Sequence, residues 1–316
     1  MNMETLEKTR KKYKNTILIS VIIYIISLAV PMILRADTIV ILNLIGGLVI
    51  IALITRNPKT NYSNAYKEYF VETNLKKLFT DLKYEPNTEM PFNVIAETKM
   101  MNMGSEYSSN DFISGKYKNI GFSQADICIE QRYQTVDSDG NSRTVYVTIF
   151  KGRWMIFNFN KQFKANVQVV QKGFKNNTVK LRGLFTKKDD KSGYEKVEME
   201  SAKFNKKFVV YAQNEHEAFY ILTPSLMEKI EKLDDDNSGK IMLCFINNKL
   251  HIGLSDNKDS FEAPNCFFKI KEEKEIEKTT RDIKIITQFV DELNLDNELF
   301  KKSSDLEENI NKRKID

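Results

Sequence analysis

Two uncharged apolar runs dominate the start of this sequence, at residues 17–34 and 38–54, and only Arg35, Ala36 and Asp37 separate them. An α-helix rises about 1.5 Å per residue, so each run makes roughly 26 Å of helix, slightly short of the ~30 Å hydrocarbon core of a bilayer. The pattern predicts a transmembrane helical hairpin over residues 17–55. A cleaved signal peptide and a re-entrant or interfacial hairpin are the alternatives, although no small-residue cleavage site follows the first run.

Basic residues flank the hairpin on both sides. The first sixteen residues carry five basic and two acidic side chains, Arg56 and Lys59 follow the second run, and the turn carries one charge of each sign. The positive-inside rule therefore places both termini in the cytoplasm and the turn outside. We expect a two-span protein of the cell membrane, with the lipid bilayer as its first partner.

Charge outside the N-terminal segment is nearly balanced. The net charge is +5 over 316 residues, and the first sixteen residues supply +3 of it. A domain with this balance is not expected to bind nucleic acid. The three cysteines, Cys128, Cys244 and Cys266, lack Cys-x-x-Cys spacing, so we expect reduced thiols in a cytoplasmic domain.

Hydrophobic periodicity after the hairpin predicts helices and many strands. Helices are expected over residues 61–82, within 91–103, after the cap-and-proline pair Thr223 and Pro224, and over 272–293. Strands are expected over residues 122–134, 143–150, 154–159, 166–171, 178–184, 195–200, 207–211, 218–222, 241–246 and 249–254. Lys151-Gly152 predicts a tight turn between two of these strands, and the polar end of the chain, after Asn294, is expected to fray.

These features predict a fold of the α+β class. A two-helix transmembrane hairpin is followed by a mainly antiparallel β-sheet cytoplasmic domain with flanking helices. The expected divisions are a basic cytoplasmic N-terminus (1–16), the hairpin (17–55), a helical connector (56–103), an α+β soluble domain (104–270), and a C-terminal helix with a polar tail (271–316).

Three stretches carry a resemblance to a known family. They are residues 111–115 (DFISG), residues 150–161 (FKGRWMIFNFNK) with Phe163, and residues 204–208 (FNKKF) through 210–212 (VYA) to 220–224 (YILTP) and Met227. The sequence resembles the bacterial family called domain of unknown function 3137, some of whose members carry the misleading label galanin. The resemblance implies a membrane-anchored protein with a soluble domain and brings no catalytic residues. Such proteins look to be encoded near the LemA family, which hints at a LemA-like partner protein in the membrane.

A basic sector at residues 151–191 is the most informative charge feature. It holds eleven basic and two acidic residues, a local charge of +9, with aromatic residues interleaved. One interpretation is an ordinary solvated sheet face. The other is a face turned to anionic lipid or to a membrane partner, with Lys172, Lys175, Lys187 and Lys188 as its candidate contact residues.

Motifs for catalysis, cofactors and metals are absent from the sequence. There is no phosphate-binding glycine loop and no Gly-x-Ser-x-Gly, and His216 and His251 are the only histidines. Residues 234–239 (DDDNSG) resemble the opening of a calcium loop, but Phe245 stands where its bidentate glutamate belongs. We therefore predict no catalytic residues, no cofactor and no metal ligands.

Two functional hypotheses remain. The first is a membrane-anchored, non-enzymatic interaction or scaffold module that contacts anionic lipid or a membrane partner. The alternative is an enzyme acting on a membrane-linked substrate, with Asp111, His216 and Glu217 as its polar candidates. A deep pocket with convergent titratable groups would favour the enzyme, whereas a flat apolar or charged patch would favour the module.

Overall fold

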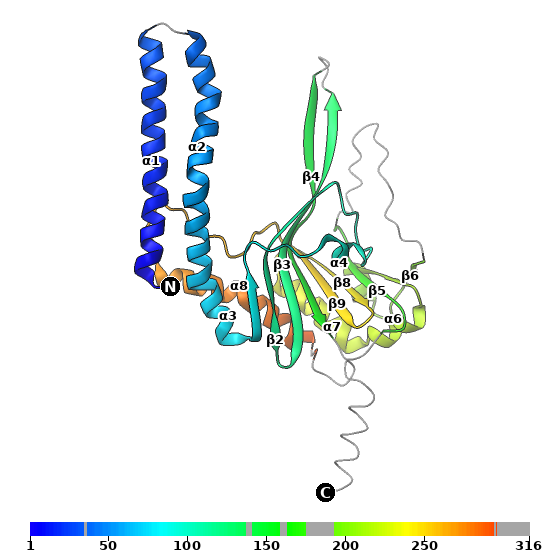
Figure 1. Ribbon diagram of the computed structural model, residues 1–316. Helices are drawn as coiled ribbons and strands as arrows, with labels where there is room; N and C mark the ends of the chain where they lie inside the picture. Colours follow the sequence, from blue (N-terminus) through cyan, green and yellow to red (C-terminus); the bar gives the residue numbers. More distant parts are fainter. Residues whose placement is uncertain (35–36, 137–140, 159–162, 175–192, 294, 296–316) are drawn as a thin grey trace. The chain divides into compact units, whose positions relative to one another are not determined.

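The computed structural model describes residues 1–316 except 35–36, 137–140, 159–162, 175–192, 294 and 296–316. The chain divides into two compact units, which Figure 1 shows in sequence colours. The first unit comprises Met1–Lys77 and Phe261–Ile283. The second unit comprises Leu78–Ser260 and the chain from Lys284 onward.

Helices make up most of the first unit. In chain order they are α1 (Met3–Ile33), α2 (Asp37–Tyr66), the π-helix η1 (Lys67–Glu72), α3 (Thr73–Leu78) and the first part of α8 (Glu272–Leu293). Asn2 caps α1, because its side-chain oxygen accepts a hydrogen bond from the Thr5 amide at 2.9 Å. The helix predicted over residues 61–82 corresponds to the end of α2, η1 and α3. It ends at Leu78, and Leu82 lies in a strand.

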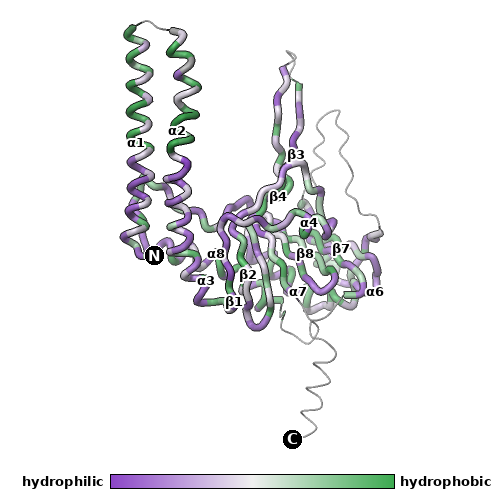
Figure 2. Tube along the Cα trace, viewed as in Figure 1, coloured by the Kyte–Doolittle hydropathy of each residue, from purple (hydrophilic) through white to green (hydrophobic). Residues whose placement is uncertain are grey.

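Helices α1 and α2 pack against each other along their apolar lengths (Figures 1 and 2). The Asn43 side-chain amide donates to the Ser27 main-chain oxygen at 2.9 Å, and the Tyr24 hydroxyl donates to the Leu44 oxygen at 3.0 Å. Gly47 faces Tyr24 so closely that an added Cβ would lie 2.2 Å from the ring, whereas Gly46 meets nothing within 4 Å. Tyr24, Asn43 and Gly47 thus join the two helices of the hairpin to each other.

An antiparallel sheet forms the centre of the second unit. Within the described residues it has nine strands in the order β1-β2-β3-β4-β9-β8-β5-β7-β6. The strands are β1 (Thr80–Glu85), β2 (Glu106–Tyr117), β3 (Ile120–Val136), β4 (Ser142–Asn158), β5 (Val167–Gln171), β6 (Glu195–Val197), β7 (Phe208–Ala212), β8 (Lys240–Ile246) and β9 (Lys249–Ser255). Helices α4 (Phe92–Ala96), α5 (Ala202–Lys207), α6 (Glu215–Ile221), α7 (Pro224–Asp236) and the end of α8 complete this unit. The predicted α+β architecture with a large antiparallel sheet and flanking helices is confirmed at this level.

The predicted turn at Lys151-Gly152 is wrong. Strand β4 runs through both residues, and Gly152 pairs with Ile127 of β3. Gly152 has a φ of 148° and lies against the Leu254 main-chain oxygen, where a side chain would not fit. The glycine therefore permits a close approach between strands rather than a reversal of the chain.

The strand predicted over residues 218–222 is also wrong, because this segment lies mostly in helix α6. Asn214 caps the helix by accepting a hydrogen bond from the Glu217 amide. Ala218 and Ile221, three residues apart, are the buried positions of the helix, and that spacing suits one helical face.

Several predictions are confirmed. Thr223 caps α7, whose buried residues include Leu226, Met227, Ile230 and Leu233. The β8–β9 hairpin turns at residues 247–248, α8 has the predicted bounds, and a short helix lies at Phe92–Ala96. The strand predicted over residues 178–184 and nearly all of the polar tail lie outside the described residues.

The central strands are covered on both faces. One face of β3 and β4 carries Ala125, Ile127, Trp154 and Ile156, which form a core cluster with Ile95 of α4 and with residues of β8. Gln124, Asp126, Arg153, Met155 and Phe157 alternate with these residues and are also buried. Strand β4 is therefore a central strand, between β3 and β9. Its second face, however, carries a buried polar row that the sequence analysis did not anticipate.

Candidate functional site

The apolar surfaces of α1 and α2 are the first feature of functional interest. Both helices are long and apolar enough to cross a membrane, and almost none of either apolar stretch is buried within the protein. Ile33 and Ile45, for example, are 80% and 72% exposed. In Figure 2 these surfaces form a hydrophobic band on the upper part of both helices, and the lower ends of the helices are mainly hydrophilic.

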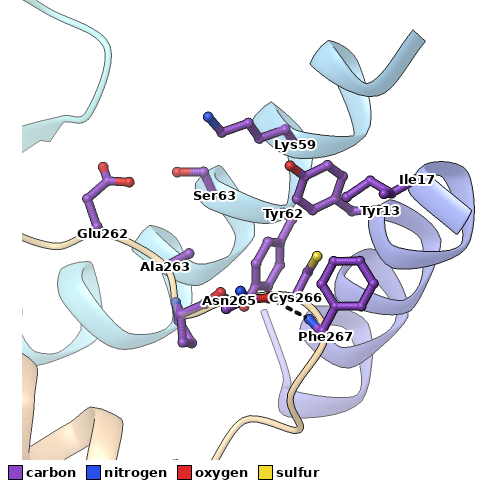
Figure 3. Close-up of a pocket in the computed structure, with 11 residues that line it drawn as sticks. Tyr13, Ile17, Lys59, Tyr62, Ser63, Glu262, Ala263, Asn265, Cys266 and Phe267 are labelled. Atoms are coloured by element: carbon purple, nitrogen blue, oxygen red, sulfur yellow. Dashed lines mark hydrogen bonds between the residues drawn. The ribbon is translucent and has the colours of Figure 1, made fainter. Parts of the chain in front are cut away.

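A pocket of about 280 Å³ lies in the first unit where this hydrophobic band ends. We call it the Cys266 pocket, and Figure 3 shows that α1, α2 and the loop around Cys266 each contribute side chains to it. Tyr13 and Ile17 come from α1, and Lys59, Tyr62 and Ser63 come from α2. The loop contributes Glu262, Ala263, Pro264, Asn265, Cys266 and Phe267.

Hydrogen bonds to main-chain oxygens fix the loop of the Cys266 pocket between the two helices. Arg10 of α1 donates to the Cys266 oxygen at 2.5 Å, and Tyr62 of α2 donates to the Pro264 oxygen at 2.9 Å. Arg10 also forms a 2.8 Å ion pair with Glu7. Because Arg10 is buried, its charge needs that carboxylate partner.

The charge states around the pocket follow from these contacts. Burial disfavours the charged form of Glu7, but the hydrogen bonds from Arg10 and from the Ile270 amide outweigh it and lower the pKa of this carboxyl. Burial raises the pKa of the Cys266 thiol and of the Tyr62 phenol, so both are neutral at pH 7. Lys59 is exposed and supplies a cation at the pocket rim.

A cluster of three carboxylates lies in the second unit. One carboxylate oxygen from each of Asp111, Asp126 and Asp259 lies within 4.8 Å of the other two. Asp111 and Asp126 are buried, and Asp259 is exposed. We call these three residues the aspartate cluster.

The β2–β3 register brings two members of the aspartate cluster together. Asn110 pairs with Asp126, and a bulge follows immediately, between Asn110 and Ile113. Asp111 lies in this bulge with a φ of 54°, in the left-handed region that aspartate tolerates better than most residues. Asp259 comes from the segment after β9, and the Asn110 amide donates to Asp111 at 2.9 Å and to Asp259 at 3.2 Å.

Asp126 lies in the most constrained environment of the three. Its Oδ2 accepts a hydrogen bond from the Ser260 amide, and Arg153 donates to the Ser260 hydroxyl at 2.7 Å. Burial raises the pKa of Asp126 to about 7, although the nearby charge of Arg153 opposes this, and the charges of Asp111 and Asp259 raise it further. Asp126 thus holds a proton more readily than an ordinary aspartate does.

Residues 148–295 match the family described as "Protein of unknown function (DUF3137)". The resemblance predicted from the sequence is confirmed over these residues. Among solved structures, the chain is similar to "crystal structure of the mycobacterial trehalose monomycolate transport factor A, TtfA", with a TM-score of 0.36 and 10% sequence identity. That similarity covers 73% of this chain and 93% of the other, and at this score it carries no argument about fold or function. A search of curated proteins found no match.

The structure does not bring the polar candidates for an enzyme together. Asp111 lies on β2, whereas His216 and Glu217 lie on α6, which contacts β6 and β7 at the other end of the sheet. Strands are about 4.8 Å apart, so β2 and β7 are separated by more than 20 Å. His216 is exposed, and Glu217 accepts a hydrogen bond from the Lys164 amide at 3.1 Å.

The basic sector lies only partly within the described residues. The ammonium group of Lys172 donates to the Asn205 oxygen at 2.5 Å, and the side chain is exposed just after β5. Lys175, Lys187 and Lys188 lie outside the described residues. A lipid- or partner-facing role for this sector stays a prediction.

Sequence reasoning missed the aspartate cluster, since its members are far apart in the chain. One sequence feature pointed to a buried polar site. Gln124 and Asp126 alternate with the apolar residues Ala125 and Ile127, and all four are buried in strand β3. The run at residues 234–239 resembles the opening of a calcium loop in sequence. In the structure its first two carboxylates, Asp234 and Asp235, form ion pairs with Lys207.

Proposed function

We propose that this chain is a two-span membrane protein and that its remaining part is a non-enzymatic binding module held at the membrane surface. The observation that carries the proposal is the uncovered apolar surface of α1 and α2. Exposure of apolar surface to water costs about 25 cal/mol per Å², so these helices need lipid around them. The charge distribution supports cytoplasmic placement of both termini, since basic residues precede α1's apolar stretch and follow that of α2.

The Cys266 pocket is the proposed binding site of the module. Ile17 begins the first apolar run, and Tyr13 and Lys59 lie just outside the two runs. In a membrane this position is the headgroup layer, where tyrosine side chains and basic residues are favoured. Phe267 and Phe268 of the loop are 43% and 72% exposed, and exposed aromatic rings beside such a pocket suit the interface.

The proposed ligand is an anionic phospholipid. Lys59 at the rim would attract the phosphate group, and the other basic residues of the flanks would add to the local positive potential. Tyr62 and Cys266 are neutral, and the Glu262 carboxylate of the lining lies 3.9 Å from the ammonium group of Lys67, which offsets its charge. The apolar side of the pocket, at Ile17 and Phe267, would accept the upper part of an acyl chain.

Membrane insertion is tested first, with the full-length chain. It should resist extraction by alkaline carbonate, and a cysteine introduced at Asp37 should react with a membrane-impermeant reagent added outside intact cells. A tag at Asp316 should be protected from the same side. Extraction by carbonate, or labelling at the opposite face, would contradict the two-span topology.

The lipid proposal is tested by fluorescence quenching in nanodiscs. A Phe267→Trp variant places a tryptophan in the pocket, and the parent chain, which has one tryptophan at residue 154, supplies the background. Brominated anionic lipid should quench the new signal more than brominated zwitterionic lipid does. Lys59→Gln should remove the difference, whereas Lys8→Gln, an exposed change earlier on α1, should preserve it. Equal quenching by the two lipids in the Phe267→Trp protein would rule out selective binding.

A further inference from the structure

Asp126 of the aspartate cluster has a buried carboxylate oxygen that the described protein contacts leave without a hydrogen bond. Asp126 is 3% exposed, and its Oδ1 has no hydrogen-bond partner among the described residues. A buried carboxylate oxygen without a partner is destabilising, and such atoms are rare in folded proteins. This unpartnered oxygen belongs to a carboxylate that lies within the cluster.

Gln124 adds a second unsatisfied group beside Asp126. It is fully buried, and neither its amide oxygen nor its amide nitrogen has a partner among the described residues. Gln124 and Asp126 are two residues apart on β3, so their side chains emerge on the same face of the sheet. The buried face around the cluster therefore offers two oxygens that no donor among the described residues occupies.

The cluster also brings three carboxylates close together. Arg153, a buried cation, pairs with Asp126 in the β3–β4 register. With all three ionised, the carboxylates repel one another, and a divalent cation between them would remove this repulsion.

We propose that Asp111, Asp126 and Asp259 bind one divalent cation. The donors are all carboxylate oxygens, which suit hard cations such as Ca²⁺ and Mg²⁺ rather than metals that favour nitrogen or sulfur. Oxygens bound to Ca²⁺ at about 2.3–2.6 Å can lie up to about 5 Å apart, whereas a Mg²⁺ shell spans only about 4.2 Å. Donor atoms within 4.8 Å of one another fit the larger shell, so the ion assigned is Ca²⁺.

The cluster is open to solvent on one side, and neighbouring side chains orient its carboxylates. Asp259 is exposed and supplies the side from which an ion would enter. The Tyr84 hydroxyl donates to Asp111 at 2.5 Å, and the Asn110 amide holds Asp111 and Asp259 together. Hydrogen bonds of this kind orient metal-binding carboxylates in many proteins. Water would complete the coordination shell on the exposed side.

The test uses the full-length chain in nanodiscs after treatment with a chelator. Titration calorimetry with Ca²⁺ should show one site per chain, and Ca²⁺ should raise the melting temperature more than Mg²⁺ at the same concentration. Terbium, a luminescent substitute for Ca²⁺, should show emission sensitised by tyrosine, since Tyr84 contacts the site. The terbium signal should fall on addition of Ca²⁺ and in a Tyr84→Phe variant.

Three substitutions assign the site. Asp259→Asn changes the exposed donor and should weaken Ca²⁺ binding about tenfold or more, with little effect on folding. Asp126→Asn should abolish binding, and if it fails to fold, Asp259→Asn decides the question. Asp236→Asn, in the run at residues 234–239, should bind Ca²⁺ as the parent does. Absence of binding by the parent, or loss of binding only in Asp236→Asn, would overturn the proposal.

Discussion

The Tyr66 hydroxyl of α2 donates a hydrogen bond to Glu275 of α8 at 2.8 Å, and both side chains are buried. These residues are 209 positions apart in sequence, so this bond joins the two chain segments of the first unit. Asn74 and Thr279 make a second such bond at 3.0 Å. The proposed membrane anchor and the start of α8 are therefore held together by buried polar contacts.

We expect Tyr66→Phe to destabilise the first unit. It removes a donor to a buried carboxylate, and hydrogen bonds to charged groups contribute about 1.5–3 kcal/mol. The matched control is Tyr69→Phe, because Tyr69 donates to Glu272 at 2.6 Å in an exposed setting where water can replace the phenol. Its cost should be about 0.5 kcal/mol. Thermal unfolding in nanodiscs measures both, and equal losses would mean that burial of the Tyr66 bond has no effect.

The contact between Gly47 and Tyr24 gives a second prediction, for the helical hairpin. A Cβ at Gly47 would lie 2.2 Å from the Tyr24 ring, and the hydroxyl of that ring is bonded to the Leu44 oxygen. Gly47→Ala should therefore cost about 1–3 kcal/mol through overpacking. Gly46→Ala, with nothing within 4 Å, should be neutral or slightly stabilising.

The two alanine variants are compared by thermal unfolding of the full chain in nanodiscs. A second change, Tyr24→Leu, should restore most of the stability lost by Gly47→Ala, because it removes the ring that the new methyl group meets. Failure of that rescue would show that the loss arises elsewhere.

A third prediction concerns pH and the buried histidine of β9. His251 accepts a hydrogen bond from the Trp154 indole at 3.3 Å, and its Nε2 lies 3.9 Å from Glu97. Burial, with a smaller contribution from Lys249, lowers the pKa of His251 to about 3. The unfolded chain binds this proton near pH 6.5 and the folded chain does not, so the histidine destabilises the fold progressively as pH falls from about 6.5 towards 3.

The slope from one such proton is about 1.4 kcal/mol per pH unit at most. Urea unfolding at pH 7.5 and pH 5 should therefore show a larger loss on acidification in the parent than in His251→Gln, which retains an acceptor for Trp154. His216→Gln is the control, since His216 is the other histidine and is exposed. An unchanged acid response in His251→Gln would contradict the assignment.

Local signals were sufficient to predict part of this fold. The uncharged runs predict α1 and α2, and Thr223 with Pro224 predicts the start of α7, because a cap and a first-turn proline act within a few residues. The β8–β9 hairpin is equally local, with Asn247 at a φ of 55° in its turn. Confirmed elements are those whose determinants lie close together in sequence.

Errors arose where distant residues decide the outcome. Leu82 belongs to β1 because β1 pairs with β2, about thirty residues later, and that pairing cannot be read from a helical stripe. The aspartate cluster depends on the Asn110–Asp126 register, on the bulge after it and on a loop beyond β9. The loop of the Cys266 pocket likewise meets α1 and α2 across most of the chain.

Gly152 gives the last prediction and shows the same dependence on distant residues. Its φ of 148° is unfavourable for other residues, and a Cβ there would lie 2.1 Å from the Leu254 main-chain oxygen of β9. Gly152→Ala should therefore combine backbone strain with a clash that the paired strands cannot relieve, at a cost of about 2 kcal/mol or more. Gly173→Ala separates the two effects, since Gly173 has a φ of 76° and nothing within 4 Å. Urea unfolding of both variants should show the larger loss at Gly152, and equal losses would mean that strain alone, without the β4–β9 contact, requires the glycine.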